Sequence, residues 1–316
     1  MSGSWAANMQ AALLAALARP GWWALALAAF MVRGGFLIAL LPIVSLPTTA
    51  DATNAFAPTV EDLIYGRPSL EQVLSGMLLI SGAFLALYSL AYAGSWLDLA
   101  LLRETTADPE LELGWSPANR SVTLALAIRL VAHLPTIVAI GYAVIRVIGV
   151  LYVELTSPGD TATPLAFRVL AQAPDAPLAV AITWLLGEAI GGLTARQVAA
   201  GEPVAASFGR SIRQVASVRG LATLAATTAA LVALLVPYVL TVATAWENVR
   251  VALFDDVGAM LTLAALVLMV STWVLGLALL GALLSWRATA WTVQVAPRSA
   301  TVTQPMPQAS EPSRQG

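Results

Sequence analysis

Long uninterrupted runs of apolar residues alternate with short polar segments along the chain. Six of these runs reach or exceed the ~18 apolar residues that mark a membrane-spanning helix. They are continuously apolar and do not alternate in polarity, which argues against a transmembrane β-barrel. Because backbone groups in lipid must be satisfied within the segment, we expect an all-α helical bundle of about six transmembrane helices with one or two interfacial helices. The expected spans are residues 22–46, 69–102, 135–154, 178–199, 221–243 and 259–285.

Helix signals refine two of these spans. Ser69 with Gln72 reads as a capping box at the start of the second span. The apolar stretch 122–155 is too long for one untilted span, and Pro135 predicts its division. Two helices are therefore expected, over about 118–133 and 135–154. A single kinked, tilted helix is the alternative.

The polarity pattern divides the chain into three parts. Residues 1–20 form a mildly amphipathic N-terminal segment, and residues 21–291 form the six-span membrane domain. Residues 292–316 are polar and proline-containing, which predicts a disordered cytoplasmic tail.

One polar segment inside the membrane domain has the periodicity of an amphipathic helix. Across residues 202–219 the apolar side chains recur on one helical face, and Arg210 and Arg213 fall on the other. We expect this helix to lie on the membrane surface with the two arginines toward anionic lipid headgroups. The lipid bilayer is thus an expected partner, together with a possible membrane-protein partner.

Composition narrows the functional classes. The sequence is 59% hydrophobic and 11% charged, where a soluble domain carries roughly 25% charged residues. Cysteine is absent, which excludes disulfides, thiolate metal sites and cysteine catalysis. A net charge of −2 without a dense basic tract gives no reason to expect nucleic acid as a partner. No cofactor or metal is expected.

All sixteen basic residues are arginine, and their distribution predicts the topology. With the N-terminus in the cytoplasm and six spans, ten arginines fall on the cytoplasmic side and three outside, a positive-inside bias. We therefore expect a multi-pass protein of the bacterial cytoplasmic (inner) membrane with both termini in the cytoplasm. The outer three are Arg67, Arg168 and Arg250.

Two opposite charges stand near the middle of apolar spans. Arg33 lies in the first span and Glu188 in the fourth, and each is followed by a glycine pair. Ionisable residues at membrane depth are costly and mark candidate functional sites. We predict a buried Arg33–Glu188 charge pair, whose role is either a structural lock between two helices or a binding site.

Arg129, His133 and Thr136 are spaced to share one helical face, so they form a second candidate site. This polar face could line a cavity, with Arg129 snorkelling to the interface as the alternative. A lone histidine without cysteine is poor evidence for a metal site. No G-x-S-x-G, H-E-x-x-H or Walker motif is present, so no catalytic residue is predicted.

Two segments carry a resemblance to known proteins. ARPGWWALALAAFMVRGGFLIALLPIVSLP, and LLGEAIGGLTARQVA followed by the arginine-bearing helix, resemble an uncharacterised family of multi-span membrane proteins from high-GC bacteria. The layout is also remotely similar to the membrane domain of bacterial glycerophosphoryl diester phosphodiesterases, without the catalytic barrel. The resemblance implies an integral membrane protein and no particular activity.

Three functions remain open at the level of sequence. The first is a membrane-organising or accessory subunit that binds lipid or protein partners within the bilayer. The second is a small-solute or lipid transporter with Arg33 and Glu188 as its central site, and the third is a membrane-embedded enzyme acting on lipid. A transporter requires a water-accessible cavity at the pair, an accessory protein a sealed pair, and an enzyme a nucleophile and base within reach.

Overall fold

The computed structural model describes residues 4–40, 43, 66, 69–118, 121–156, 163–254 and 258–295. Within these ranges every regular element is a helix and no strand occurs, which confirms the all-α class. The elements in chain order are α1 (Trp5–Ala18), α2 (Pro20–Phe30), the π-helix η1 (Met31–Gly35), α3 (Phe36–Leu40), α5 (Leu70–Thr106), α6 (Val122–Ala132), α7 (Leu134–Thr156), α8 (Leu165–Gln172), α9 (Asp175–Ala199), α10 (Val204–Ala216), α11 (Val218–Phe254) and α12 (Ala259–Val295).

Six helical segments of the described chain are long and apolar enough to cross a membrane, as the sequence predicts. The chain is therefore a multi-pass membrane protein built from antiparallel helices. The spans are Pro20–Leu40, Leu70–Thr106, Leu134–Glu154, Asp175–Ala199, Val218–Phe254 and Ala259–Val295. The Ser69–Gln72 capping box is present at the start of the second, with both reciprocal hydrogen bonds formed.

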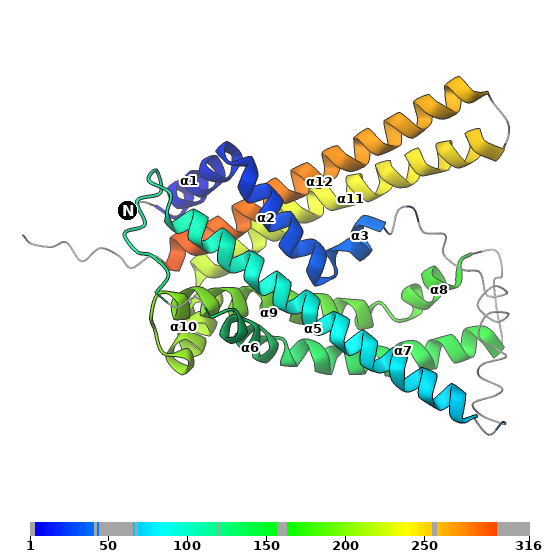
Figure 1. The fold of residues 1–316 in the computed structure, drawn as a ribbon, viewed down its shortest axis with the longest axis horizontal. Helices are drawn as coiled ribbons and strands as arrows, with labels where there is room; N and C mark the ends of the chain where they lie inside the picture. Colours follow the sequence, from blue (N-terminus) through cyan, green and yellow to red (C-terminus); the bar gives the residue numbers. More distant parts are fainter. Residues whose placement is uncertain are drawn as a thin grey trace, which may run out of the picture.

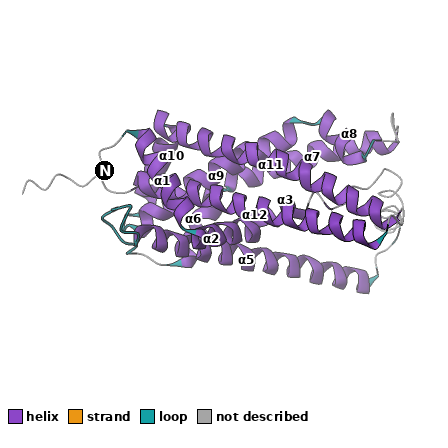
Figure 2. Cartoon of the chain, turned by 90° about the horizontal axis from the view of Figure 1, so that it is seen from above, coloured by secondary structure: helices purple, strands orange, loops and turns teal. Residues whose placement is uncertain are grey.

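The helices run roughly along one common direction and gather at one end of the molecule (Figures 1 and 2). That end holds α1, α6, α10 and the connection after α5, and the opposite end holds α8 and the tip of the α11–α12 hairpin (Figure 1). Helix α12 packs along α11 and also against α1 and α2, so the first and last spans are neighbours. The hydrophobic faces turned away from this packing are exposed in the isolated chain, as expected for a surface that meets lipid.

Two breaks interrupt the apolar helical segments. In the first span, α2 gives way to the π-helix η1, where Gly34 has a φ of +101° and the chain then continues as α3. Before the third span, α6 ends at its C-cap His133 and α7 begins at the next residue, so the prediction of two helices rather than one kinked helix is correct. Both breaks lie about 16 Å from the gathered end, given eleven helical residues at 1.5 Å each.

Two predicted boundaries are wrong. Residues 244–254, expected in a loop, continue α11, because Ala245, Val249 and Ala252 bury against the hairpin partner. Helix α12 likewise extends to Val295, so the expected start of a disordered tail at residue 292 falls within a helix whose last turns are buried. The rest of that predicted tail, residues 296–316, lies outside the described residues.

Within the N-terminal segment 1–20, Trp5–Ala18 form α1, which packs against protein rather than lying free on the bilayer surface. Its small face, with Ala12 and Ala16 fully buried, lies against α12. The indole Nε1 of Trp286 donates to the carbonyl oxygen of Met9 at 3.1 Å, and that of Trp5 donates to Thr223 at 2.9 Å. These contacts fix α1 across the ends of α11 and α12.

Candidate functional site

Four charged side chains from four elements form a closed ring at the centre of the gathered end. Arg33 of η1 contacts Asp98 of α5 at 2.7 Å and Glu188 of α9 at 3.5 Å. Arg129 of α6 contacts Glu188 at 3.1 Å and also pairs with Asp98. Each arginine therefore touches both carboxylates. The ring is neutral as a whole, which lowers the cost of burying its members.

His133 extends the ring at its Glu188 corner. Its Nδ1 lies 2.9 Å from the backbone carbonyl oxygen of Arg129, so this nitrogen donates to that oxygen. Its Nε2 then faces Glu188 Oε1 at 3.6 Å. Thr136, the third member of the predicted polar face, is buried on α7, and its hydroxyl has no partner among the described residues.

The two helix breaks place the arginines of the ring. The π-turn and the positive φ of Gly34, a conformation that favours glycine, redirect the chain directly after Arg33. The guanidinium also donates to the carbonyl oxygen of Ala29, one of the acceptors left near the break. On the other side, α6 ends at His133, so Arg129 lies in its last turn and projects towards α5 and α9. Breaks of this kind at membrane depth are tolerated where the backbone lies within protein or lines a cavity.

Glycines on the two unbroken helices make room for the broken ones. A Cβ on Gly94 of α5 would lie 2.8 Å from Cγ of Arg33. On α9, a Cβ on Gly187 would lie 3.0 Å from Cδ2 of His133, and one on Gly191 would lie 3.1 Å from the Cβ of Ala132. These glycines allow the close helix approach that small residues give in membrane proteins. They therefore set the positions of the basic side chains.

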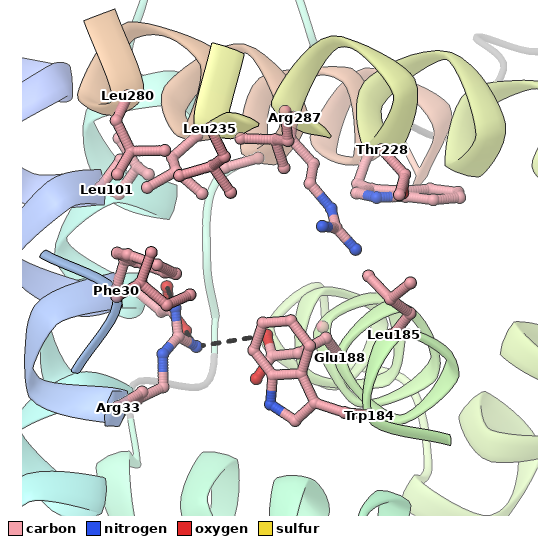
Figure 3. Close-up of a pocket in the computed structure, with 18 of the residues that line it drawn as sticks. Phe30, Arg33, Leu101, Trp184, Leu185, Glu188, Thr228, Leu235, Leu280 and Arg287 are labelled. Atoms are coloured by element: carbon pink, nitrogen blue, oxygen red, sulfur yellow. Dashed lines mark hydrogen bonds and ion pairs between the residues drawn. The ribbon is translucent and has the colours of Figure 1, made fainter. Parts of the chain in front are cut away.

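A cavity of about 250 Å³ lies beside the ring, and Arg33, Asp98, Arg129 and Glu188 all reach its wall (Figure 3). The dashed contact in Figure 3 joins Arg33 to Glu188 across one side of it. Apart from these four residues and two further arginines, the wall is mostly apolar and is contributed by α2, α5, α9, α11 and α12. A largely apolar hollow with a few convergent polar groups is typical of a ligand site.

Two more arginines, Arg196 of α9 and Arg287 of α12, line the same cavity. Arg196 donates to the carbonyl oxygens of Gly192 at 2.9 Å and Ala288 at 3.2 Å, and to the hydroxyl of Thr292 at 3.0 Å. Arg287 is directed into the hollow (Figure 3), and its Nη2 is buried without a hydrogen-bond partner among the described residues.

Sequence reasoning selected Arg33, Glu188, Arg129 and His133 but assigned them to two separate sites, and the structure brings all four together. It placed Asp98 near the far end of the second span and gave it no partner, whereas Asp98 joins both arginines of the ring. Helix α5 continues to Thr106, so Asp98 lies about two turns inside the helix rather than at its end. Arg196 and Arg287 were counted among the cytoplasmic arginines, and nothing in their spacing showed that they line a cavity.

The predicted lipid contacts Arg210 and Arg213 lie on α10, away from the ring. The helix packs on α9 through a face of small residues, with Ser207 and Ser211 fully buried. Both arginines are exposed; Arg210 pairs with Glu202, and Arg213 donates to a backbone carbonyl of its own helix. Their expected contact with anionic headgroups stays a prediction.

The side chains of the ring and the cavity wall are suited to binding charged groups of a ligand. The described residues contain no cluster of three or more histidine and carboxylate side chains that could hold a metal ion. Thr228 supplies the single hydroxyl among the described residues of the cavity wall, and no histidine lies there to activate it. The wall can thus orient and neutralise charged groups, and no nucleophile–base pair is assembled in it.

Comparisons with protein families, with curated proteins and with solved structures give no match to this chain.

Proposed function

We propose that this membrane protein is a carrier of a small solute or lipid, with the ring and its cavity as the central binding site. The observation that carries the proposal is the cavity of about 250 Å³ that Arg33 and Glu188 both reach. A purely structural lock would be expected to bury the two charges away from any hollow. The break in the first span and the break between α6 and α7 add support, because carriers commonly form their sites from discontinuous helices.

The competing role, a membrane-organising or accessory subunit, draws support from different features. The exposed arginines of α10 and the apolar faces of α5 and α7 suit lipid or protein partners. Neither feature uses the ring or the cavity, so this role leaves the costliest element of the molecule unexplained. A location in the bacterial inner membrane with both termini in the cytoplasm is part of the same proposal and rests on the arginine distribution.

The test uses the absence of native cysteine, which makes the chain a ready background for single-cysteine labelling. Leu185 and Leu235 line the cavity, whereas Ile145 of α7 is exposed on an apolar surface of the bundle. A carrier predicts that Leu185→Cys and Leu235→Cys react with a membrane-impermeant thiol reagent in intact vesicles, and that Ile145→Cys in lipid does not. Cavity cysteines as inert as Ile145→Cys, from both sides of the membrane, would sink the carrier proposal.

A further inference from the structure

The charges around the cavity do not balance. The ring accounts for two arginines and two carboxylates, and Arg196 and Arg287 add two positive charges to the same wall. Among the described residues neither of these two arginines forms an ion pair; Arg196 is held by neutral oxygen atoms. An uncompensated charge taken out of water is costly, so a binding partner of negative charge would stabilise this arrangement.

Unused hydrogen-bond donors gather on the same wall. Nη2 of Arg287, the hydroxyl of Thr228 and Nε1 of Trp291 are all buried and without a partner among the described residues, and all three residues line the cavity. They belong to α11 and α12, and Thr228 and Arg287 lie across the hollow from Glu188 (Figure 3). Buried polar groups in native proteins are nearly always paired, so three unpaired donors around one hollow indicate an acceptor that binds there.

The remaining wall is suited to an apolar group. Phe30, Leu231, Leu235 and Leu280 cover the part of the cavity between α2, α11 and α12. A ligand that matched the whole cavity would therefore place an anionic group at Arg287 and an apolar portion against these side chains.

We infer that the cavity binds an oxyanion, a phosphate or a carboxylate, at Arg287, Thr228 and Trp291. Guanidinium groups bind such oxyanions through parallel, charge-assisted hydrogen bonds, and Arg196 adds positive charge to the wall. The inference rests on the proposed carrier function and names its substrate class. The source of the oxyanion is either an amphiphile, such as an anionic lipid, or a free anion.

The test measures dissociation constants for the full chain in neutral detergent with three probes: decyl phosphate, inorganic phosphate and decyltrimethylammonium. Decyl phosphate should bind and the cation should not. Arg287→Gln should weaken decyl phosphate binding by roughly tenfold to a hundredfold, the loss expected for a charge-assisted hydrogen bond. Arg250→Gln, a change at an exposed arginine of α11 outside the cavity, is the matched control and should bind like the parent.

A folding defect is separable from lost binding in this design. Because Nη2 of Arg287 has no hydrogen-bond partner among the described residues, Arg287→Gln should melt at the same temperature as the parent or higher, and it should lose the stabilisation by decyl phosphate. Thr228→Val provides a second, uncharged change at the same site and should weaken the same probe to a smaller extent.

Each outcome decides the inference. Tighter binding of decyl phosphate than of inorganic phosphate supports an amphiphile as the source, and equal affinity supports a free anion. Absence of binding by both phosphates, or equal binding by Arg287→Gln and Arg250→Gln, overturns the oxyanion site. If neither phosphate binds but the cavity cysteines are labelled, the oxyanion site is rejected and the carrier proposal stands. If the cavity cysteines are not labelled, the carrier proposal is rejected whatever the measured affinities.

Discussion

Two of the buried ion-pair sites among the described residues are built in opposite ways. At the end away from the ring, Glu154 of α7 contacts Nε of Arg168 of α8 at 3.0 Å, with both side chains 8% exposed. Gln172 of α8 also donates to Glu154, and the same two helices form an apolar cluster with the start of α9. The ring instead joins four elements, contacts a cavity and is more exposed, with Arg33 at 22% and Glu188 at 19%.

The difference shows that burial of charge does not by itself mark a binding site. Glu154 and Arg168 lie on consecutive helices, so their pair fixes a short helix where the chain turns. The ring connects positions separated by 65 and 59 residues, with helix breaks and close glycine contacts on both sides. The ring is the less buried of the two sites, yet it is the one that requires helix breaks and close glycine contacts. This pattern is expected where function rather than stability selects the residues.

The largest effect is expected from unbalancing the ring. Glu188→Gln leaves the ring with a net positive charge, and Arg33→Gln leaves it with a net negative charge. Each change should lower the unfolding free energy by about 3–5 kcal/mol. The double variant should recover much of this loss, since Asp98 and Arg129 remain paired with each other. Unfolding in detergent, followed by circular dichroism, measures all three.

Glu154→Gln is the control from the outer pair. Its effect should be local, seen as faster amide hydrogen exchange in α8 while the amides of α9 around Glu188 keep their protection. If the double ring variant is as unstable as the worse single variant, the two side chains do not stabilise one another as a charge pair.

A smaller effect is expected from the glycines that adjoin the two sites. Gly94→Ala places a methyl group 2.8 Å from Cγ of Arg33 and should cost about 1–3 kcal/mol as Arg33 is displaced. Gly149→Ala on α7, next to the apolar cluster of the outer pair, meets no atom within 4 Å and should be neutral or stabilise by up to about 1 kcal/mol. Equal melting temperatures for the two variants would show that Gly94 does not position the ring.

The smallest effect per residue is expected at charges that belong to neither site. Arg210→Glu and Arg213→Glu should each weaken the binding of a peptide of residues 202–219 to anionic vesicles by about 1 kcal/mol. Arg213→Lys keeps the charge and serves as the control. Undiminished binding by the double glutamate variant would mean that α10 contacts protein instead of headgroups.

The sequence was sufficient for the class of fold, because span length and hydropathy depend on runs of residues rather than on single contacts. It also predicted the division between α6 and α7, where Pro135 lies in the first turn of the new helix. It did not predict the break at Gly34, since a glycine pair in an apolar run is equally compatible with close helix packing.

The composition of the site was less predictable than the fold. Arg33 and Glu188 could be selected because each interrupts an apolar span near its middle. Asp98, Arg196 and Arg287 lie close to the span ends that hydropathy predicts, at residues 102, 199 and 285, where charges usually meet headgroups or water. Their inward direction follows from how α5, α9 and α12 rotate against their neighbours, and this depends on contacts between segments far apart in the sequence.

The packing of α1 and α2 on α12 has a consequence for biosynthesis. Met9 and Trp286, which hydrogen-bond in the finished protein, are 277 residues apart. At ~5–20 residues per second, a ribosome needs roughly 14–55 s to make the chain between them. The first span is therefore in the membrane for this time without α12, its final neighbour. The charge of Arg33 can be neutralised earlier, because Asp98 follows it by only 65 residues and arrives with the second span.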